Sequence, residues 1–312
     1  MPDWWIERGI GETRAVLIKD RRIVEARILR DGVVPVGTTL AARLTRSGAR
    51  NSVAVADARE YLLPKGAAGV TQGASLAIEV TREALAGAEP WKRPLARWSD
   101  AAPCTAPALA GRDLNFPSPT DELEAVGWSD LIDEARSGIV AFPGGELRIA
   151  LTPAMALIDV DGGLPPVDLA IAGARAAARA IRRHGIGGSI GIDLPTCRGK
   201  AERQAVAEAV DAILPQPFER TAVNGFGFIQ IVRPRRHASL LELAADRPAF
   251  EARALLRRAA REVGRVWLVA HPAVIAALDP AWLAALSLQV GGTVDLRADP
   301  ALAMSAAYAT NA

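Results

Sequence analysis

Two aspartates stand where their carboxylates could act together on one ligand. Asp159 and Asp193 each follow apolar residues typical of a buried strand and precede turn formers, residues 161–163 in one case and Pro195 in the other. A helix pattern from 168 to 184 separates them, which predicts a βαβ unit. The crossover makes its two strands parallel and often adjacent, about 4.8 Å apart, so equivalent side chains can meet at one point. Two anions that close require a cation or a shared proton.

A magnesium ion suits such a pair, because Mg²⁺ typically takes one or two carboxylates and keeps several waters. Asp161 is a third acid near the same edge, expected to act through water because the turn redirects it. A structural alternative stays open, since acids after strands also cap turns and helices. The chain has no GxxxxGK[ST] loop, which excludes a P-loop nucleotide hydrolase, and the glycines at 185–188 precede a strand, unlike those of a dinucleotide-binding loop.

The pattern of strands and helices that would position these acids predicts an α/β (α+β) multidomain protein. Its segments are a hairpin (14–19 and 23–29), a small five-stranded barrel within 36–83, a Pro- and Ala-rich linker or wrapping loop (87–120), a mixed sheet with strands at 156–160, 189–192, 218–223 and 226–232, and a C-terminal α+β part with a helix at 250–263 and strands at 266–270 and 293–296.

Composition narrows the class of protein. The 312 residues are 50% hydrophobic, which predicts two or three packed units. No apolar run approaches the roughly 20 residues of a membrane span, and Asp3 and Glu7 occupy the place of a signal-peptide core, so we expect a cytoplasmic protein. Cys104 and Cys197 form no CxxC pair, so both are expected to be reduced thiols and neither a disulfide nor zinc is predicted. The net charge of +2 leaves room only for a local basic patch.

Three ordered motifs resemble the ribonuclease E/G family: LTPAMALIDVDGG (151–163), GIGGSIGIDLP (185–195) and NGFGFIQIVRPR (224–235). The opening GETRAVLIKDRRIVEARI (11–28) is similar to the family's first hairpin, and residues 36–83 stand where the family has an S1 RNA-binding barrel. By this resemblance, Asp159 and Asp193 match the two metal-binding aspartates.

The chain departs from the family pattern in four places. Asp161 replaces an asparagine, and no CPxCxG zinc link follows the third motif. The Pro-rich stretch 87–120 replaces the 5′ end sensor. Aliphatic residues near Val55 and Leu62, with Tyr61 nearby, replace the stacking phenylalanines of the barrel. Base stacking is therefore expected to be weaker or relocated.

Several basic residues are candidates for phosphate contact, with ordinary solvated surface as the alternative. The cluster at the end of the third motif follows the family's arginine strand, Lys200 begins the helix after Asp193, and two arginines lie on the barrel. The candidate RNA-binding residues are Arg233, Arg235, Arg236, Lys200, Arg43 and Arg46.

The resemblance implies a magnesium-dependent endoribonuclease, with manganese as an acceptable substitute, that hydrolyses phosphodiester bonds in single-stranded RNA during RNA processing or decay. Catalysis would fall to Asp159, Asp193 and Asp161, and the metal to Asp159 and Asp193. The alternatives are a noncatalytic RNA-binding protein on the same scaffold and a small-molecule phosphatase. A homodimer is compatible with the sequence, but not a zinc-linked one.

The same resemblance divides the chain into five expected parts. These are the hairpin of an RNase H-like core (1–32), an S1-like (OB) barrel (33–86), a Pro/Ala-rich linker (87–122), a nuclease-like mixed-sheet catalytic core (123–240) and a small C-terminal α+β domain (241–312).

Overall fold

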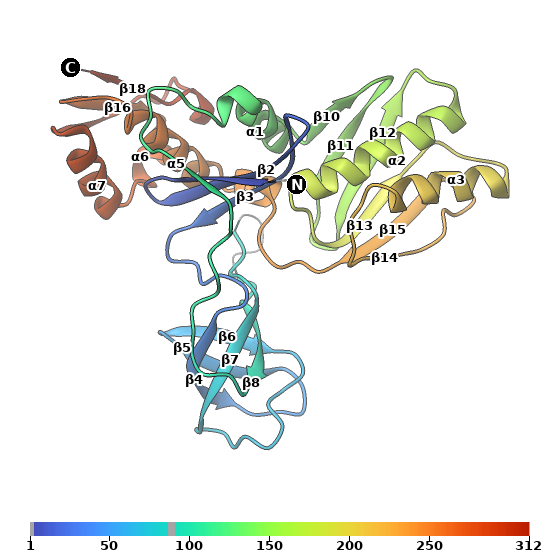
Figure 1. The fold of residues 1–312 in the computed structure, drawn as a ribbon, viewed down its shortest axis with the longest axis horizontal. Coiled ribbons are helices and arrows are strands. Elements are labelled where there is room, and N and C mark those ends of the chain that lie inside the picture. Colours follow the sequence, from blue (N-terminus) through green and yellow to red (C-terminus); the bar gives the residue numbers. More distant parts are fainter. Residues whose placement is uncertain (1–2, 87–90, 312) are drawn as a thin grey trace. The chain divides into compact units, whose positions relative to one another are not determined.

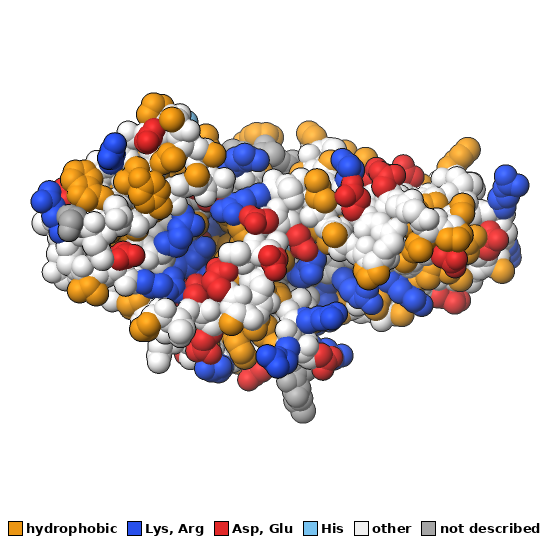
Figure 2. All heavy atoms as spheres, turned by 90° about the horizontal axis from the view of Figure 1, so that it is seen from above, with side chains coloured by type: hydrophobic (Ala, Val, Ile, Leu, Met, Phe, Trp, Pro, Cys, Tyr) orange, Lys and Arg blue, Asp and Glu red, His pale blue; other side chains and the backbone are white. Residues whose placement is uncertain are grey.

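The computed structural model describes residues 3–86 and 91–311, which form two compact units (Figure 1). Unit 1 comprises Met1–Asp31, Ala110–Arg136 and Leu243–Ala312, and unit 2 comprises Gly32–Leu109 and Ser137–Glu242. Among the described residues, no helix combines the length and apolar character required to cross a membrane. Figure 2 shows Lys and Arg side chains interleaved with Asp and Glu on the face seen from above, in keeping with the net charge of +2.

Unit 1 contains two sheets. The first has the order β3-β2-β1-β9, in which β1 and β9 are parallel and the other pairs antiparallel; its strands are β1 (Asp3–Arg8), β2 (Glu12–Lys19), β3 (Arg22–Arg30) and β9 (Arg112–Leu114). The second has the order β17-β16-β18, from β16 (Val266–Ala270), β17 (Val294–Ala298) and β18 (Tyr308–Asn311). The helical elements of this unit are η1 (Glu124–Val126), α1 (Trp128–Ser137), α5 (Arg247–Ala259), α6 (Pro272–Ala276), α7 (Pro280–Val290) and η2 (Met304–Ala306).

A closed five-stranded barrel forms the first part of unit 2. Its order is β4-β5-β6-β8-β7, from β4 (Thr39–Arg46), β5 (Ser52–Ala56), β6 (Arg59–Leu63), β7 (Ser75–Arg82) and β8 (Leu95–Ser99). Alternating residues fill its interior, among them Leu44, Ala54 and Ile78, which are fully buried. Asp57 and Ala58 form the tight turn between β5 and β6, and both have positive φ angles, as such a turn requires.

A six-stranded mixed sheet forms the second part of unit 2. Its order is β10-β11-β12-β13-β15-β14, from β10 (Ile139–Phe142), β11 (Gly145–Leu151), β12 (Ala156–Gly162), β13 (Gly188–Asp193), β14 (Glu219–Arg220) and β15 (Phe228–Arg233). Helices α2 (Pro166–Arg183) and α3 (Lys200–Asp211) lie side by side against it (Figure 1) and share its core. Helix α4 (Leu240–Ala245) follows and spans the boundary between the units.

The Ala-rich composition of α2 explains why this helix packs closely against the sheet. Alanines at 170, 174, 177, 178 and 180 are fully buried. Gly173 continues this face, and a Cβ atom there would stand 2.3 Å from Cγ1 of Val160. The helix therefore packs backbone against strand β12 at this point, which fixes the strand that carries Asp159.

The predicted mixed α/β class, the hairpin, a five-stranded barrel and the βαβ unit are confirmed, but the barrel extends to Ser99, beyond its predicted bounds of 33–86. The predicted linker 87–122 is wrong as a strandless segment: it contains β8, the fifth barrel strand, and β9. Prolines obscured β8, because Pro94 and Pro103 flank this strand without interrupting it. Residues 87–90 of that segment lie outside the described residues.

The compact units also differ from the expected domain boundaries. The opening hairpin belongs to unit 1 together with residues 243–312, whereas the two aspartates belong to unit 2. Helix α1, expected in the catalytic core, lies in unit 1 except for its last residue. The barrel and the aspartate-bearing sheet, expected as separate domains, fall within one unit.

Candidate active site

Asp159 and Asp193 lie directly opposite each other on adjacent parallel strands. Strands β12 and β13 pair in parallel, and their register places Ile158 against Ile192 and Asp159 against Asp193. The expected adjacency of the two strands and of their aspartates is therefore confirmed. With neighbouring strands about 4.8 Å apart, two carboxylates in this register can reach one ligand.

Both aspartates project from the sheet face opposite to α2 and α3. Val160 packs against Gly173 of α2, and Ile192 is fully buried. Successive side chains of a strand alternate between the two faces. Asp159, half-buried, and Asp193, exposed, therefore occupy the other face, where solvent can reach them.

The charges around Asp159 oppose its ionisation. Burial raises the pKa of Asp159 above its ordinary value, and the nearby Asp161 and Asp193 carboxylates raise it further. The backbone N–H of Val160 and the Arg148 guanidinium act in the opposite direction, without cancelling the rise. A dication bound between the acids would relieve this repulsion.

Asp161 is placed differently from the expectation. No turn follows Asp159 directly: β12 continues to Gly162, and Asp161 pairs with Glu146 of β11. Period-two alternation puts Asp161 on the same face as Asp159, where its Oδ2 lies 3.9 Å from Nε of Arg148. Within residues 3–86 and 91–311, no group of three or more His, Cys, Asp or Glu side chains is arranged to hold a metal. The fit to a metal therefore depends on the in-register pair Asp159 and Asp193, with water as the further ligands.

Arg148 is a site residue that the sequence reasoning missed. It lies opposite Asp159 on β11, and its Nη2 donates to Oε1 of Glu146 at 2.5 Å. The signal was available, because the Pro143-Gly144 turn fixes the register of the β10–β11 hairpin and hence the face of Arg148. Arg148 supplies positive charge beside the acids without a metal.

The arginine cluster and the aspartates lie at opposite ends of β13. Arg233 pairs with Gly188 at one end of the ladder, and Phe228 pairs with Asp193 at the other. Five residue steps at about 3.3 Å separate the two ends by roughly 17 Å. The Arg233–Arg236 segment can therefore contact a phosphate of a long ligand, but a different phosphate from the one at the acids.

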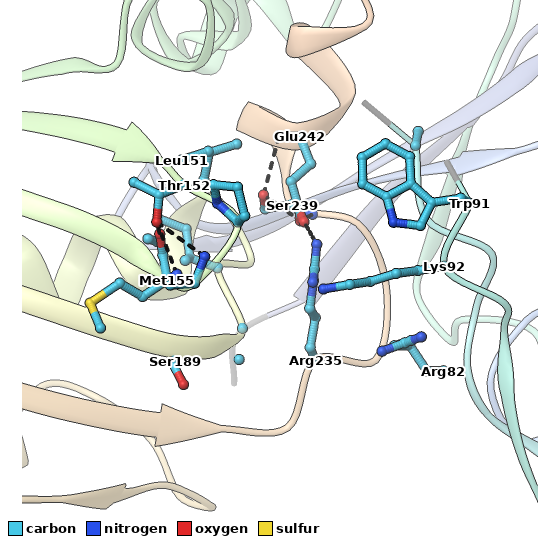
Figure 3. A pocket seen from close by; sticks show the side chains of 17 residues that line it. Arg82, Trp91, Lys92, Leu151, Thr152, Met155, Ser189, Arg235, Ser239 and Glu242 are labelled. Carbon is cyan, nitrogen blue, oxygen red and sulfur yellow. Dashed lines mark hydrogen bonds and ion pairs between the residues drawn. The ribbon is translucent and has the colours of Figure 1, made fainter. Parts of the chain in front are cut away.

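A cavity of about 300 Å³ lies in unit 2 at the arginine end of the sheet (Figure 3). Arg82, Lys92 and Arg235 contribute positive charge to its lining, and Trp91, 72% exposed, contributes an aromatic face. Arg235 donates a hydrogen bond to Oε1 of Glu242, so its charge is partly neutralised. The turn at 152–155, together with Gly187 and Gly188, also lines the cavity.

The other basic candidates are spread over unit 2. Lys200 is exposed and is the first residue of α3, the helix that follows Asp193 at the end of β13. Arg43 and Arg46 are exposed on β4 of the barrel, where Arg43 donates to the Gly73 carbonyl at 3.1 Å. Arg236 is exposed. Arg82, Trp91 and Lys92 were missed: Arg82 ends β7, two residues beyond the predicted strand, and Trp91 and Lys92 lie in a proline-rich segment that gives no periodic signal.

Tyr61 cannot serve as a base-stacking residue of the barrel. It is 1% exposed inside the barrel core, and burial raises the pKa of its hydroxyl. Val55 and Leu62 are half-buried. The barrel face of β5 and β6 thus offers aliphatic contact without a stacking ring.

The whole chain was also compared with known proteins. Neither a protein-family model nor a curated protein matches this chain significantly.

Proposed function

We propose that this protein is a magnesium-dependent endoribonuclease that hydrolyses phosphodiester bonds in single-stranded RNA. The observation that carries the proposal is the register of Asp159 with Asp193 on a solvent-accessible sheet face. Opposed carboxylates on adjacent parallel strands are a suitable base for a hydrated dication in phosphoryl chemistry. The raised pKa of Asp159 supports a site in which the negative charge of the acids outweighs the positive charge of Arg148.

In this proposal, Asp159 and Asp193 hold magnesium, or manganese in its place. The bound ion would polarise the scissile phosphate and lower the pKa of a water molecule at the site. The chain's own part is to fix the two carboxylates through paired strands whose opposite face is buried against α2 and α3. Asp161 and Arg148 lie beside the pair and tune its charge.

The finer fold assignments belong to the same proposal. The barrel order β4-β5-β6-β8-β7 supports an S1-like barrel of the OB type, a class whose second and third strands bind oligonucleotides. In unit 1, a three-stranded antiparallel meander extended by the parallel strand β9 supports an RNase H-like sheet. The aspartate-bearing sheet is then the nuclease-like part.

Binding of an RNA backbone is supported by the cavity of Figure 3. Arg82 and Lys92 offer positive charge there, and Trp91 offers a ring on which a base can stack. Arg43 and Arg46 add exposed charge on the barrel. A single strand that passes from this cavity to the acids would span about 17 Å of β13, a length that requires an extended ligand.

The test is cleavage of labelled single-stranded RNA by the purified chain with Mg²⁺. Asp159→Asn and Asp193→Asn are expected to lower the cleavage rate by roughly 100-fold or more, because loss of an outer partner of a metal ligand already costs about 10- to 100-fold. The matched control is Asp20→Asn, in the β2–β3 turn, where φ is 50° and Asn is tolerated. Cleavage that persists in EDTA, or in both site variants, would refute the proposal.

One observation favours a second candidate, a noncatalytic RNA-binding protein. Arg148 lies opposite Asp159 and partly offsets the rise in the pKa of Asp159, so the acids have a partial counter-charge within the chain. RNA binding with no cleavage at any Mg²⁺ or Mn²⁺ concentration would select this candidate.

A further inference from the structure

Phe226 is the most exposed aromatic residue among those the structure describes, at 85%. It lies in the short turn 224–227, between β14 and β15, and Phe228 two residues later pairs with Asp193. An isolated surface hydrophobe needs no explanation by itself, but this ring is held beside the candidate active site. Its backbone shows how it is held.

The turn is ordered by its own hydrogen bonds. Oδ1 of Asn224 accepts from the N–H groups of Phe226 at 2.9 Å and of Phe228 at 3.0 Å. Gly227 has φ of 93°, and a Cβ atom there would stand 2.1 Å from the Leu194 carbonyl oxygen. Only glycine fits at that point. The turn therefore presents Phe226 outward on a fixed backbone.

The turn is also fastened to the segment that follows Asp193. The N–H of Leu194 donates to the Gly227 carbonyl at 3.3 Å, and the Thr196 hydroxyl lies 3.5 Å from the Phe226 carbonyl. A bound group that reaches Asp193 would thus lie within a few residues of the Phe226 ring.

Two positively charged residues, Arg198 and Lys200, lie in the segment 194–200 that follows Asp193. Nη1 of Arg203 donates to the carbonyls of Cys197 at 3.1 Å and Arg198 at 2.9 Å, which fixes the backbone. The side chains of Arg198 and Lys200 are exposed, and neither forms a hydrogen bond or an ion pair within the described part of the chain. Both cations are therefore available to an anionic ligand.

We propose that Phe226, with Arg198 and Lys200, forms a subsite for one nucleotide next to the scissile bond: the base stacks on the Phe226 ring, and the two cations contact the flanking phosphate. The subsite rests on the proposed ribonuclease function and adds a stacking ring that strands β5 and β6 of the barrel lack, since Tyr61 is buried. A single-stranded nucleic acid fits best, because a π face and adjacent cations match a base and its phosphate.

Binding without cleavage isolates the subsite. Fluorescence anisotropy with single-stranded RNA is measured in Ca²⁺ in place of Mg²⁺. Phe226→Leu is expected to weaken binding roughly 5- to 100-fold, the range of one lost stacking contact. Phe226→Trp keeps an aromatic ring and is expected to bind RNA as the parent does. Arg198→Gln is expected to weaken RNA binding and to make the affinity less dependent on salt concentration. Tyr308→Leu, at a 45% exposed aromatic of unit 1, is the matched control and is expected to have no effect. Unchanged thermal unfolding shows that each variant folds.

An RNA series with one abasic site then locates the contact. One abasic position is expected to weaken binding to the parent but to add no further loss in Phe226→Leu, because both changes remove the same stack. Equal affinity of Phe226→Leu and the parent overturns the subsite, even if the parent cleaves RNA. A change confined to self-association in Phe226→Leu also overturns it, by assigning the ring to a protein interface. Stacking without any cleavage supports the subsite while refuting the ribonuclease.

Discussion

Asp159 and Asp193 face each other without offset across β12 and β13, and the Asp193 carboxylate helps to raise the pKa of Asp159. An acid whose folded pKa is raised destabilises the fold as pH rises through its ordinary value. Asp193→Asn removes one of the charges that raise the pKa of Asp159. Without metal, this variant is expected to be more stable than the parent at pH 7 by roughly 0.5–1 kcal/mol, a small figure because solvent screens the site.

The measurement is urea unfolding in EDTA at pH 4 and pH 7, together with a carboxyl NMR titration of Asp159. The gain is expected at pH 7 and not at pH 4, and the pKa of Asp159 is expected to fall. A parent and variant of equal stability at both pH values would show that the two carboxylates do not interact.

Arg148 competes with a bound cation for the same acids. Arg148→Gln removes the nearby positive charge that lowers the pKa of Asp159, so Mg²⁺ is expected to bind about two- to fivefold more tightly. Mg²⁺-dependent thermal stabilisation measures this affinity. Arg97→Gln, at an exposed ion pair with Glu79 on the barrel, is the control. Weaker Mg²⁺ binding in Arg148→Gln would mean that Arg148 positions the acids.

Sequence alone predicted the elements whose hydrophobic period is clear. The apolar runs around Asp159 and Asp193, separated by an Ala-rich helix, are sufficient to predict adjacent parallel strands. The proline-rich stretch 87–120 gave no such signal: β8 spans Leu95–Ser99 between prolines, and its pairing with β7 is a long-range contact. Local propensity cannot show which distant strand completes a barrel.

The candidate site was predictable in part for the same reason. A strand's alternation placed Asp159 on one face, but the neighbour on that face, Arg148, depends on the register of a different hairpin. The exposure of Phe226 also could not be predicted, because an FGF pattern at a strand start is equally compatible with two buried rings. Only the three-dimensional structure shows that the first ring is 85% exposed.

Unit 1 depends on a buried ion network centred on Arg14, which is 1% exposed. Its Nη2 lies 2.6 Å from Oε1 of Glu7 and 2.8 Å from Oδ2 of Asp121. Arg14→Met leaves the buried Glu7 carboxylate with only the longer, 3.4 Å contact to Arg261 and is expected to cost about 3–5 kcal/mol in free energy of unfolding. Arg8→Met, at an exposed pair with Asp113, is expected to cost less than about 1 kcal/mol. Urea unfolding of both variants compares them, and similar losses would contradict the assigned role of burial.

The same network makes the stability of unit 1 sensitive to acid. Burial opposes ionisation of Asp121, but Arg14 and Arg261 outweigh it and hold the pKa of this carboxyl below its ordinary value of 3.8. An acid with a lowered folded pKa contributes stability above its unfolded value, and this contribution is lost as pH falls through the folded pKa. Stability is therefore expected to drop below about pH 4, and less steeply in Asp121→Asn. Stability profiles from pH 2 to 7 test this, and identical slopes would contradict it.

The contact between α2 and β12 opposes the usual helix preference for alanine. Gly173→Ala gains up to about 1 kcal/mol of helix propensity, but the added Cβ would stand 2.3 Å from Cγ1 of Val160. Overpacking of this kind costs about 1–3 kcal/mol, so a net loss of stability is expected. Val160→Ala removes the obstructing methyl groups, so the double variant should be more stable than the sum of the two single changes predicts. Chemical unfolding of the four proteins measures this coupling, and strict additivity would mean that α2 shifts freely on the strand that carries Asp159.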